Sequence, residues 1–498
     1  MSVTGRRARH TGLAVVVAVC LATVQGGSGP GNDAEPPTVP ATAVTVAPEA
    51  AISVVPGPDP VARTTAVSRL VFEQSPVVVV AAPDPESVRL AADAAGSLHV
   101  PVLAAAAPDL GEELTRLDAT TVLTVAPAPL DLDDERHVLP RPGAVRAATE
   151  ELAADLEAPE PAGDGLLVLT LDPAVDALAL ATLAGSTVVH VPGGDPRADP
   201  AIAAQLRSAG APPTVLLGDG WSAPEYTLQV VRTAPEQPGG GHLVLPGRHI
   251  IALYGSPGTA ALGLLGEQGA AESVARTQGY VQQYAGISDR PVVGAFELIA
   301  TIADAVPGPD GDYSLEVPVE ELRPWVDAAR EAGMYAILDL QSGRTDFLTQ
   351  AQRYTDLLLQ PHVGLALDPE WRLAPDQVHL RQFGTVSGAE VNAVADWLAT
   401  LTRDHGLPQK PFVLHQFTPS MINGREQIRT DRPELATIIH VDGQGAPPDK
   451  VGTWNLIRTG APAGTFWGWK NFLDEDLPML TPEQTWGVGP RPDLVTYQ

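Results

Sequence analysis

The sequence predicts an α/β protein with two parts, an N-terminal parallel α/β repeat domain followed by a (β/α)8-type TIM barrel. Two observations predict this fold class. Short apolar runs alternate with Ala- and Leu-rich amphipathic segments, which is typical of buried parallel strands joined by helices. Beyond residue 246, nearly every apolar run also ends in polar residues, as strands do at the catalytic end of a barrel. An open doubly wound sheet is the alternative for this second part, although it would gather polar strand ends near one switch point.

Composition limits the partners of this chain. Its 498 residues are enough for two or three domains with their own cores. The chain carries 60 acidic and 31 basic residues, a net charge of −29. Because phosphate binding needs clustered Lys and Arg, we expect no nucleic-acid partner.

The N-terminus is typical of an export signal. Arg6, Arg7 and Arg9 precede an apolar stretch at 13–24, which predicts a signal peptide over residues 1–26. That stretch is short for a membrane span, so we expect none in the mature chain. The single cysteine, Cys20, follows the bulky Val19, and we therefore favour a secreted or cell-wall-associated protein over a lipoprotein anchored at Cys20. Residues 27–60 are rich in Pro and Ala and predict a flexible linker.

The region 61–233 contains an internal repeat. In each unit an apolar run is followed by an Ala/Leu helix that ends at Gly-Ser, a second apolar run, another helix and a third apolar run. This order predicts parallel strands that alternate with helices. The apolar runs lie at 77–81, 100–103 and 121–125 in the first unit, and at 166–171, 188–191 and 214–217 in the second.

This repeat resembles the cell wall-binding repeat 2 family of surface proteins. The matching segments are 65–72, before the first strand, and 175–184, after the first strand of the second unit. The resemblance implies non-covalent attachment to a cell-wall polymer. The alternative is an α/β spacer that binds nothing. A Pro- and Gly-rich break predicts a second linker over 234–245.

The region 246–498 predicts the barrel, with helices at 319–332, 388–403 and 449–458. An eighth strand is expected either at 378–383 or near 262–265. The seven clear strands lie at 249–255, 292–297, 335–339, 363–370, 412–416, 437–442 and 465–471.

The fourth of these strands ends in Asp368-Pro-Glu370-Trp371. On a strand, residues two apart point to the same side, so Asp368 and Glu370 are expected to face one space. Two close carboxylates do not ionise independently, which suits acid/base chemistry. The alternative is a strand end with a helix-capping Asp and a solvated Glu.

The polar strand ends would meet at one rim if the barrel closes. The catalytic candidates are Glu370, Asp368, Glu297 and Asp442. The substrate-binding candidates are Tyr254, Asp339, Gln341, Trp371, His415, Gln416, Gln444, Trp469 and Lys470. Structural alternatives remain for several of these residues: helix caps for Asp339 and Asp442, a core histidine for His415 and barrel packing for Trp469.

The chemistry follows from the residue types. The chain lacks His-x-His, His-Glu-x-x-His, Gly-x-Ser-x-Gly and phosphate-binding Gly-rich motifs, so we expect no metal and no cofactor. Carboxylate pairs hydrolyse glycosidic bonds, and tryptophan faces stack on sugar rings, which predicts a cell-wall polymer or polysaccharide as partner. In this hypothesis Glu370 is the general acid, with its pKa raised by Asp368. Asp368, Asp442 or Glu297 would serve as nucleophile, base or charge stabiliser.

The Asp-x-Glu at the end of the fourth strand resembles secreted barrel-type glycoside hydrolases, including lysozyme-like and chitinase-like groups. The barrel as a whole resembles uncharacterised exported proteins of actinobacteria that join it to such a repeat region. Two alternatives remain open. One is a non-catalytic cell-wall or carbohydrate-binding protein, and the other is a metal-dependent hydrolase that uses Asp339, Asp368, Glu370 and His415.

Overall fold

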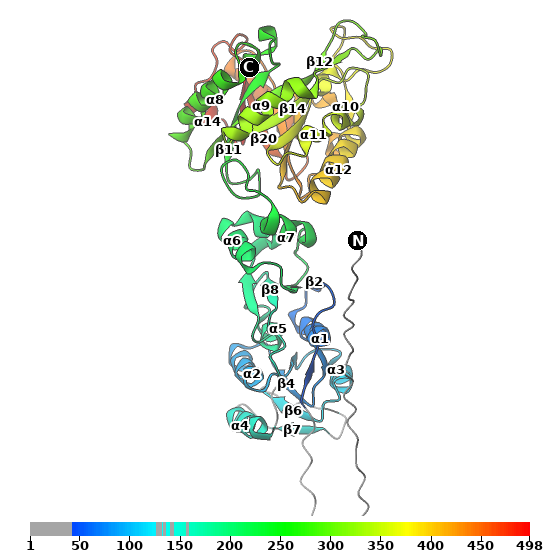
Figure 1. Ribbon diagram of the computed structural model, residues 1–498, viewed down its shortest axis with the longest axis vertical. Coiled ribbons are helices and arrows are strands. Elements are labelled where there is room, and N and C mark those ends of the chain that lie inside the picture. The colour runs from blue at the N-terminus through cyan, green and yellow to red at the C-terminus, as the bar shows by residue number, and fades with distance from the viewer. Residues whose placement is uncertain (1–41, 126–131, 133–135, 140–143, 156–158) are drawn as a thin grey trace, which may run out of the picture. The chain divides into compact units, whose positions relative to one another are not determined.

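The computed structural model describes residues 42–125, 132, 136–139, 144–155 and 159–498 (Figure 1). The expected signal peptide at 1–26, with Cys20, and the first part of the expected linker lie outside the described residues. No helix in the described part of the chain is both long and apolar enough to cross a bilayer.

The N-terminal region contains two four-stranded parallel sheets that share one strand order. The first sheet has the order β5 (Val102–Ala104), β4 (Val77–Ala81), β6 (Thr121–Thr124), β7 (His137–Leu139). The second has the order β9 (Thr187–His190), β8 (Leu167–Thr170), β10 (Thr214–Leu217), β2 (Ile52–Val55). The three strands of each expected repeat unit therefore take equivalent places, and the predicted parallel α/β architecture is confirmed.

The fourth strand of the second sheet corrects the expected boundary of the N-terminal linker. Strand β2 lies inside the range 27–60, yet it pairs in parallel with β10, with Ile52 opposite Thr214. The sequence does not reveal this strand, because its four residues lie in a Pro- and Ala-rich segment without apolar periodicity. Its pairing partner also comes much later in the chain. The remaining elements of this region are β1 (Val44–Thr45), β3 (Phe72–Gln74), α1 (Pro60–Val71), α2 (Pro85–Leu98), α3 (Leu110–Arg116), α4 (Val145–Asp155), α5 (Ala177–Thr182), α6 (Pro200–Ala209) and α7 (Pro224–Thr233), with the 3-10 turns η2 (Pro192–Gly194) and η3 (Pro196–Ala198).

Asp-Pro pairs begin three of these helices. Asp59, Asp84 and Asp199 each accept a hydrogen bond from a backbone N–H of the following turn, and the next residue is proline. An N-terminal carboxylate satisfies helix N–H groups that have no other partner, and proline at the first helical position already has a helical φ. These pairs therefore fix where the helices start after the sheet strands and loops.

The C-terminal region is a closed barrel of eight parallel strands, which confirms the predicted fold class and excludes an open sheet. It closes through β11 and β21, where Ile250 pairs with Leu494. The strands, in barrel order, are β11 (His249–Gly255), β12 (Val292–Ala303), β14 (Tyr335–Leu340), β15 (Val363–Leu367), β17 (Lys410–Gln416), β19 (Leu435–Val441), β20 (Phe466–Asn471) and β21 (Leu494–Tyr497).

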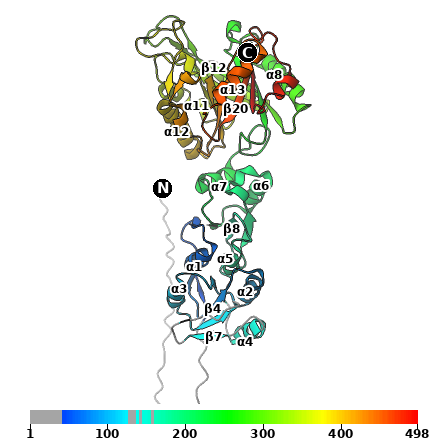
Figure 2. The ribbon, with the colours of Figure 1, turned by 180° about the vertical axis from the view of Figure 1, so that it is seen from behind.

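The helices lie outside the barrel strands (Figures 1 and 2). They are α8 (Ala270–Ala285), α9 (Val319–Glu331), α10 (Phe347–Arg353), α11 (Thr355–Leu358), α12 (Gly388–Asp404), α13 (Pro447–Arg458) and α14 (Pro482–Trp486). The shorter elements are β13 (Ser314–Glu316), β16 (Val386–Ser387), β18 (Ile422–Asn423) and the 3-10 turns η4 (Ala260–Leu262), η5 (Leu264–Gly266), η6 (Pro369–Trp371), η7 (Pro419–Met421) and η8 (Arg425–Gln427).

Both positions proposed for the eighth strand are wrong. Residues 378–383 form a loop, and 262–265 lie in the turns η4 and η5. The eighth strand is β21, which has only four residues and follows a Pro-rich turn.

The lower half of the barrel interior is apolar. Inward side chains of alternating strand positions pack there, including Ile250, Ala295, Ile337 and Val413. Val244 and Leu245 belong to the same buried cluster, so the end of the segment expected as the linker 234–245 is part of the barrel core.

Candidate functional site

A layer of polar side chains lies above the apolar interior of the barrel. Side chains alternate between the two faces of a strand, so the inward positions follow every second residue. Each strand places one polar inward side chain at this level, whereas the inward residues before it along the strand are mainly apolar. This layer consists of Tyr254, Glu297, Asp339, Asp368, His415, His440, Lys470 and Thr496.

Five residues of this part of the barrel form a closed ring of hydrogen bonds. His415 lies between two carboxylates, with Nε2 2.8 Å from Glu297 Oε1 and Nδ1 2.7 Å from Asp442 Oδ2. The second oxygen of Asp442 bonds to His440 Nδ1. Thr496 completes the ring, because its hydroxyl donates to Glu297 Oε2 over 3.0 Å and lies 2.8 Å from His440 Nε2.

These contacts fix the charges of His415, Glu297 and Asp442. Ionised carboxylate oxygens only accept hydrogen bonds, so both nitrogens of His415 carry hydrogen and its side chain is an imidazolium cation. Burial alone would lower the pKa of His415, but Asp442 and Glu297 outweigh it and raise the pKa well above 6.5. Burial alone would raise the pKa of Glu297, but His415 brings it down to about 2. Asp442 is likewise held well below its ordinary pKa by His415 and Lys470 against the effect of burial.

Strand register brings the two histidines together. His415 and His440 are partners in the pairing of β17 with β19, and their ring centroids are 4.9 Å apart. On the other side, His440 is opposite Gly468 of β20. A Cβ atom on Gly468 would collide with the His440 imidazole, so only glycine leaves room for this ring.

A second group of contacts surrounds Tyr254. Its hydroxyl donates to Asp339 Oδ2 over 2.7 Å and accepts from Gln341 Nε2 over 3.2 Å. Lys470 Nζ lies 3.7 Å from the centre of the Tyr254 ring and 3.9 Å from Asp442 Oδ2. Burial raises the pKa of Asp339 to about 6, against the opposing effect of His415. Tyr254 therefore connects Lys470, which lies over its ring, with Asp339, which accepts a hydrogen bond from its hydroxyl.

Asp368 and Glu370 lie beyond the end of their strand, which corrects their expected local structure. Strand β15 ends at Leu367, and Pro369–Trp371 form the 3-10 turn η6. Trp371 Nε1 donates to Asp368 Oδ2 over 3.1 Å. Burial, followed by the charge of Glu370, raises the pKa of Asp368 well above 3.8. Burial and Asp442 raise the pKa of Glu370 to about 7.

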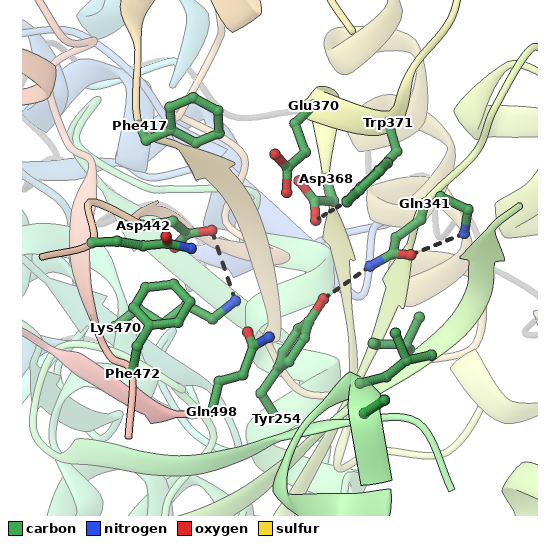
Figure 3. Close-up of a pocket in the computed structure, with 15 residues that line it drawn as sticks. Tyr254, Gln341, Asp368, Glu370, Trp371, Phe417, Asp442, Lys470, Phe472 and Gln498 are labelled. Atoms are coloured by element: carbon green, nitrogen blue, oxygen red, sulfur yellow. Dashed lines mark hydrogen bonds and ion pairs between the residues drawn. The ribbon is translucent and has the colours of Figure 1, made fainter. Parts of the chain in front are cut away.

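These groups line one cavity of about 320 Å³ at the C-terminal end of the barrel (Figure 3). Glu370 and Asp368 lie on one wall, and Asp442 and Lys470 face them across the cavity. Neither Asp339 nor Asp442 caps a helix, since α10 is capped by Asp346 and α13 begins after Ala446. The expected residues that line the cavity are Tyr254, Gln341, Asp368, Glu370, Trp371, Asp442, Gln444 and Lys470.

The other expected residues do not line this cavity. Glu297, Asp339 and His415 are fully buried behind its lining, where Asp339 contacts Tyr254, His415 contacts Asp442, and Glu297 contacts His415. Trp469 donates its indole N–H to Asn471 and packs against Trp454 at a centroid distance of 5.5 Å, so it contributes to barrel packing. Gln416 is also fully buried, and its amide has no partner among the described residues.

The sequence-based prediction missed several cavity residues and two members of the ring. Phe417 directly follows strand β17, whereas Phe472 and Gln498 follow β20 and β21. His440 could have been found, since it lies two residues before Asp442 and shares its side of the strand. Thr496 could not, because the strand that carries it was not recognised. The other lining residues are Ala261, Leu262, Ile299 and Ala303.

One set of donor atoms in this site has metal-like spacing. The atoms of His415, His440 and Asp442 lie within 4.8 Å of one another. They already bond to one another, so an ion would have to replace the two contacts that keep Asp442 ionised. The other group with such spacing among the described residues, Asp310, Asp312 and Glu316, lies away from the cavity lining.

The fold and the cavity together define a (β/α)8-barrel protein with a carboxylate-rich site at the C-terminal ends of its strands. No protein-family model matches this chain, and no curated protein matches it. A solved structure that it resembles is Cwp6 from Clostridium difficile, with a TM-score of 0.26 and 12% sequence identity over 53% of this chain. The likeness spans 64% of the Cwp6 chain, somewhat less than two thirds of its length.

Proposed function

We propose that the barrel is a glycoside hydrolase in which Glu370 is the general acid and Asp442 is the ionised carboxylate. One observation carries this proposal: a single cavity holds two kinds of carboxyl group whose pKa values are shifted in opposite directions. Glu370 has a pKa of about 7, and that of Asp442 lies well below 3.8. Two carboxyl groups with separated pKa values are what hydrolysis of a glycosidic bond requires.

In this mechanism Glu370 holds a proton below about pH 7 and gives it to the oxygen of the departing sugar. As that C–O bond breaks, positive charge develops on the sugar ring. The Asp442 carboxylate stabilises this charge, and it either bonds to the anomeric carbon or takes a proton from the attacking water. The amide side chains of Gln444 and Gln498 are available to bind sugar hydroxyls, whereas that of Gln341 already bonds to Tyr254 and Ala303.

The buried ring of hydrogen bonds around His415 would support this chemistry from behind the cavity. The His415 imidazolium bonds to Asp442 Oδ2 and keeps that carboxylate ionised at the pH where Glu370 is protonated. Glu297 in turn balances the positive charge of His415. His415 and Glu297 are therefore positioning residues in this proposal, not groups that touch the sugar.

A non-catalytic carbohydrate-binding protein is the second candidate, and one observation favours it. Both oxygens of Asp442 already bond to histidines, which lowers the carboxylate's availability as a nucleophile or base. A binding protein would use the same cavity, with Trp371 as an aromatic face and the amides as hydroxyl partners.

We also propose that the N-terminal sheets attach the protein to a cell-wall polymer after export. The support is the repeat in residues 61–233 and its resemblance to cell wall-binding repeats. The full chain should then co-sediment with insoluble cell walls, and Glu370→Gln should leave this unchanged. Loss of sedimentation in Glu370→Gln would assign wall binding to the barrel instead.

The hydrolase proposal is tested by incubating the full chain with peptidoglycan, arabinogalactan-type glycans and α- or β-glucans, and measuring new reducing ends. Glu370→Gln should lower the rate on the accepted glycan by about 10²- to 10⁴-fold, the usual contribution of a general acid. Glu267→Gln, a change of the same type away from the cavity, is the matched control and should leave the rate unchanged. If no glycan is cut but Glu370→Gln and wild type bind one equally well, the barrel is a binding protein.

A further inference from the structure

Three hollows meet at Glu370. The cavity described above is one of them. The second, of about 320 Å³, is lined by Glu370 and Trp371 on one side and by Leu380 and Phe383 on the other. The third, of about 280 Å³, lies between Glu370, Phe383, Phe417 and Asp442. Since each pair of hollows shares lining residues besides Glu370, the three hollows adjoin one another.

The outer hollows differ in character from the first. Phe383 is 64% exposed and Leu380 is 85% exposed, which is unusual for such large apolar side chains. The Phe383 ring meets the edge of Phe417 at a centroid distance of 4.9 Å. Two aromatic rings thus stand beside the carboxyl group that we assign as the acid. Neither Phe383 nor Leu380 belongs to a core cluster of the barrel, so packing does not account for them.

The loop that carries these side chains is anchored at its base. Gly384 N–H donates to the carbonyl oxygen of Glu370 over 2.6 Å, and Arg372 Nε donates to Glu390 over 2.9 Å. His379 Nε2 lies 3.0 Å from the Tyr313 carbonyl oxygen. The loop therefore holds Phe383 at a defined place relative to Glu370.

We propose that the outer hollows bind further sugar units, and that the barrel cuts a polysaccharide within its chain instead of removing units from an end. The inference rests on the hydrolase function proposed above and extends it to the substrate. An enzyme that removes a terminal sugar needs little space beyond the scissile bond. Here two further hollows adjoin the cavity at Glu370, and one reaches Arg381 while the other reaches Thr453, so there is space for more than one further sugar unit beside the cleaved bond.

The side chains that line the three hollows suit a sugar chain that is cleaved in the first hollow and bound in the other two. Sugar rings have apolar C–H faces and polar edges. The first cavity offers carboxyl and amide groups to the hydroxyls, and the outer hollows offer the faces of Phe383, Phe417 and Trp371. The polymer is thereby cleaved at Glu370, with its neighbouring units resting on the aromatic rings.

The test compares wild type, Phe383→Ala and Leu477→Ala in the full chain. Leu477 is 74% exposed and lies outside the three hollows, so its variant is the matched control. Two substrates are used: a polymer from the panel that wild type cleaves, and the 4-nitrophenyl glycoside of its repeating sugar. Viscosity of the polymer solution is followed together with reducing ends, because cuts within a chain lower viscosity early.

Phe383→Ala should lower kcat/KM on the polymer roughly tenfold, and change that on the 4-nitrophenyl glycoside by less than about twofold, since stacking of one ring is lost. Leu477→Ala should match wild type on both substrates. Equal values for Phe383→Ala and wild type on the polymer, or an equal loss on both substrates, would overturn the proposed subsites. A release of small sugars with no early fall in viscosity would overturn cleavage within the chain.

Failure of the hydrolase function has a different outcome. If wild type cuts no glycan of the panel, cleavage is refuted, and affinity for the same polymers is measured by isothermal titration calorimetry. Weaker binding by Phe383→Ala than by Leu477→Ala would keep the outer hollows as glycan-binding sites. Equal binding by both variants would refute them as well.

Discussion

Replacing His415 with glutamine removes the cation that lies between two buried carboxylates. His415 is fully buried, bonds to Glu297 over 2.8 Å and to Asp442 over 2.7 Å, and has no solvent to replace it. The variant leaves a negative charge on Glu297 in the barrel interior with a neutral amide as its partner. We therefore expect the variant barrel to be clearly less stable than wild type near neutral pH.

The size of this effect follows from the titration of Glu297. Its pKa lies at about 2 instead of the ordinary 4.5, in a fully buried position. At about 1.4 kcal/mol for each pH unit, this difference corresponds to ~3 kcal/mol of stability. Breaking a buried ion pair by removing one partner costs about 3–5 kcal/mol in other proteins, which agrees with this value. We expect a loss of this order for His415→Gln at pH 6.5.

The pH dependence of the stability difference between wild type and His415→Gln is a second, independent test of the charge on His415. In wild type the lowered pKa of Glu297 contributes stability that is present above about pH 4.5 and is lost as the pH falls toward 2. Without the imidazolium, burial raises the pKa of Glu297 above 4.5. A raised carboxyl pKa makes the folded state more stable as the pH falls, so the deficit of the variant should shrink between pH 6.5 and 4.5.

Urea unfolding followed by tryptophan fluorescence measures both quantities. All tryptophans except Trp221 lie in the barrel part of the chain, so the signal mainly reports the barrel. His405→Gln is the control, because His405 is exposed and its imidazole lies at hydrogen-bond distance from the carbonyl oxygen of Leu401, away from any carboxylate of the site. A His415→Gln protein as stable as wild type at pH 6.5, or one whose deficit grows on acidification, would refute the charge assignment of the ring.

Three further predictions concern the same site. Gly384→Ala would place a Cβ atom against the carbonyl oxygens of Arg372 and Glu370, the latter at 2.7 Å. Because the loop base must shift, kcat/KM should fall at least about tenfold, and an unchanged value would contradict the close packing there. Tyr254→Phe removes the hydrogen bond to Asp339 and should lower the free energy of unfolding by about 1–3 kcal/mol, measured by urea titration, whereas a neutral effect would mean that water replaces the hydroxyl. Chelation with EDTA should leave the rate of reducing-end release unchanged, because the donor atoms closest to metal spacing are bonded to one another, and a loss restored by added metal would favour a metal-dependent hydrolase.

Most of the barrel could be predicted from the sequence because its strands are continuous apolar runs that end in polar residues. The eighth strand could not. Leu494–Tyr497 is short, follows a Pro-rich turn and has no charged residue at its end. The strand Ile52–Val55 escaped for a related reason, since its pairing with β10 joins segments far apart in the chain. Long-range pairing of very short strands leaves no local signal in a sequence.

The residue types of the site could be predicted from the sequence, but not which of those residues reach the cavity. Strand ends indicated that Glu297, Asp339 and His415 gather with Asp442. They gave no information on which of these side chains reach the cavity and which stay behind it. That division depends on the height of each residue along its strand, which the barrel register sets. Asp368 and Glu370 do line the same cavity, although they reach it from a 3-10 turn and not from a strand.

The pH dependence of kcat/KM, measured for wild type and Glu370→Gln on the same glycan, tests the central claim most directly. Glu370, the acid, has a pKa of about 7, and the pKa of Asp442 lies well below 3.8. Wild-type activity should therefore fall above about pH 7, because Glu370 loses the proton that it donates. The small residual activity of Glu370→Gln should lack this fall. A wild-type profile that stays flat through pH 8, or the same alkaline fall in Glu370→Gln, would contradict the assignment of Glu370 as the proton donor.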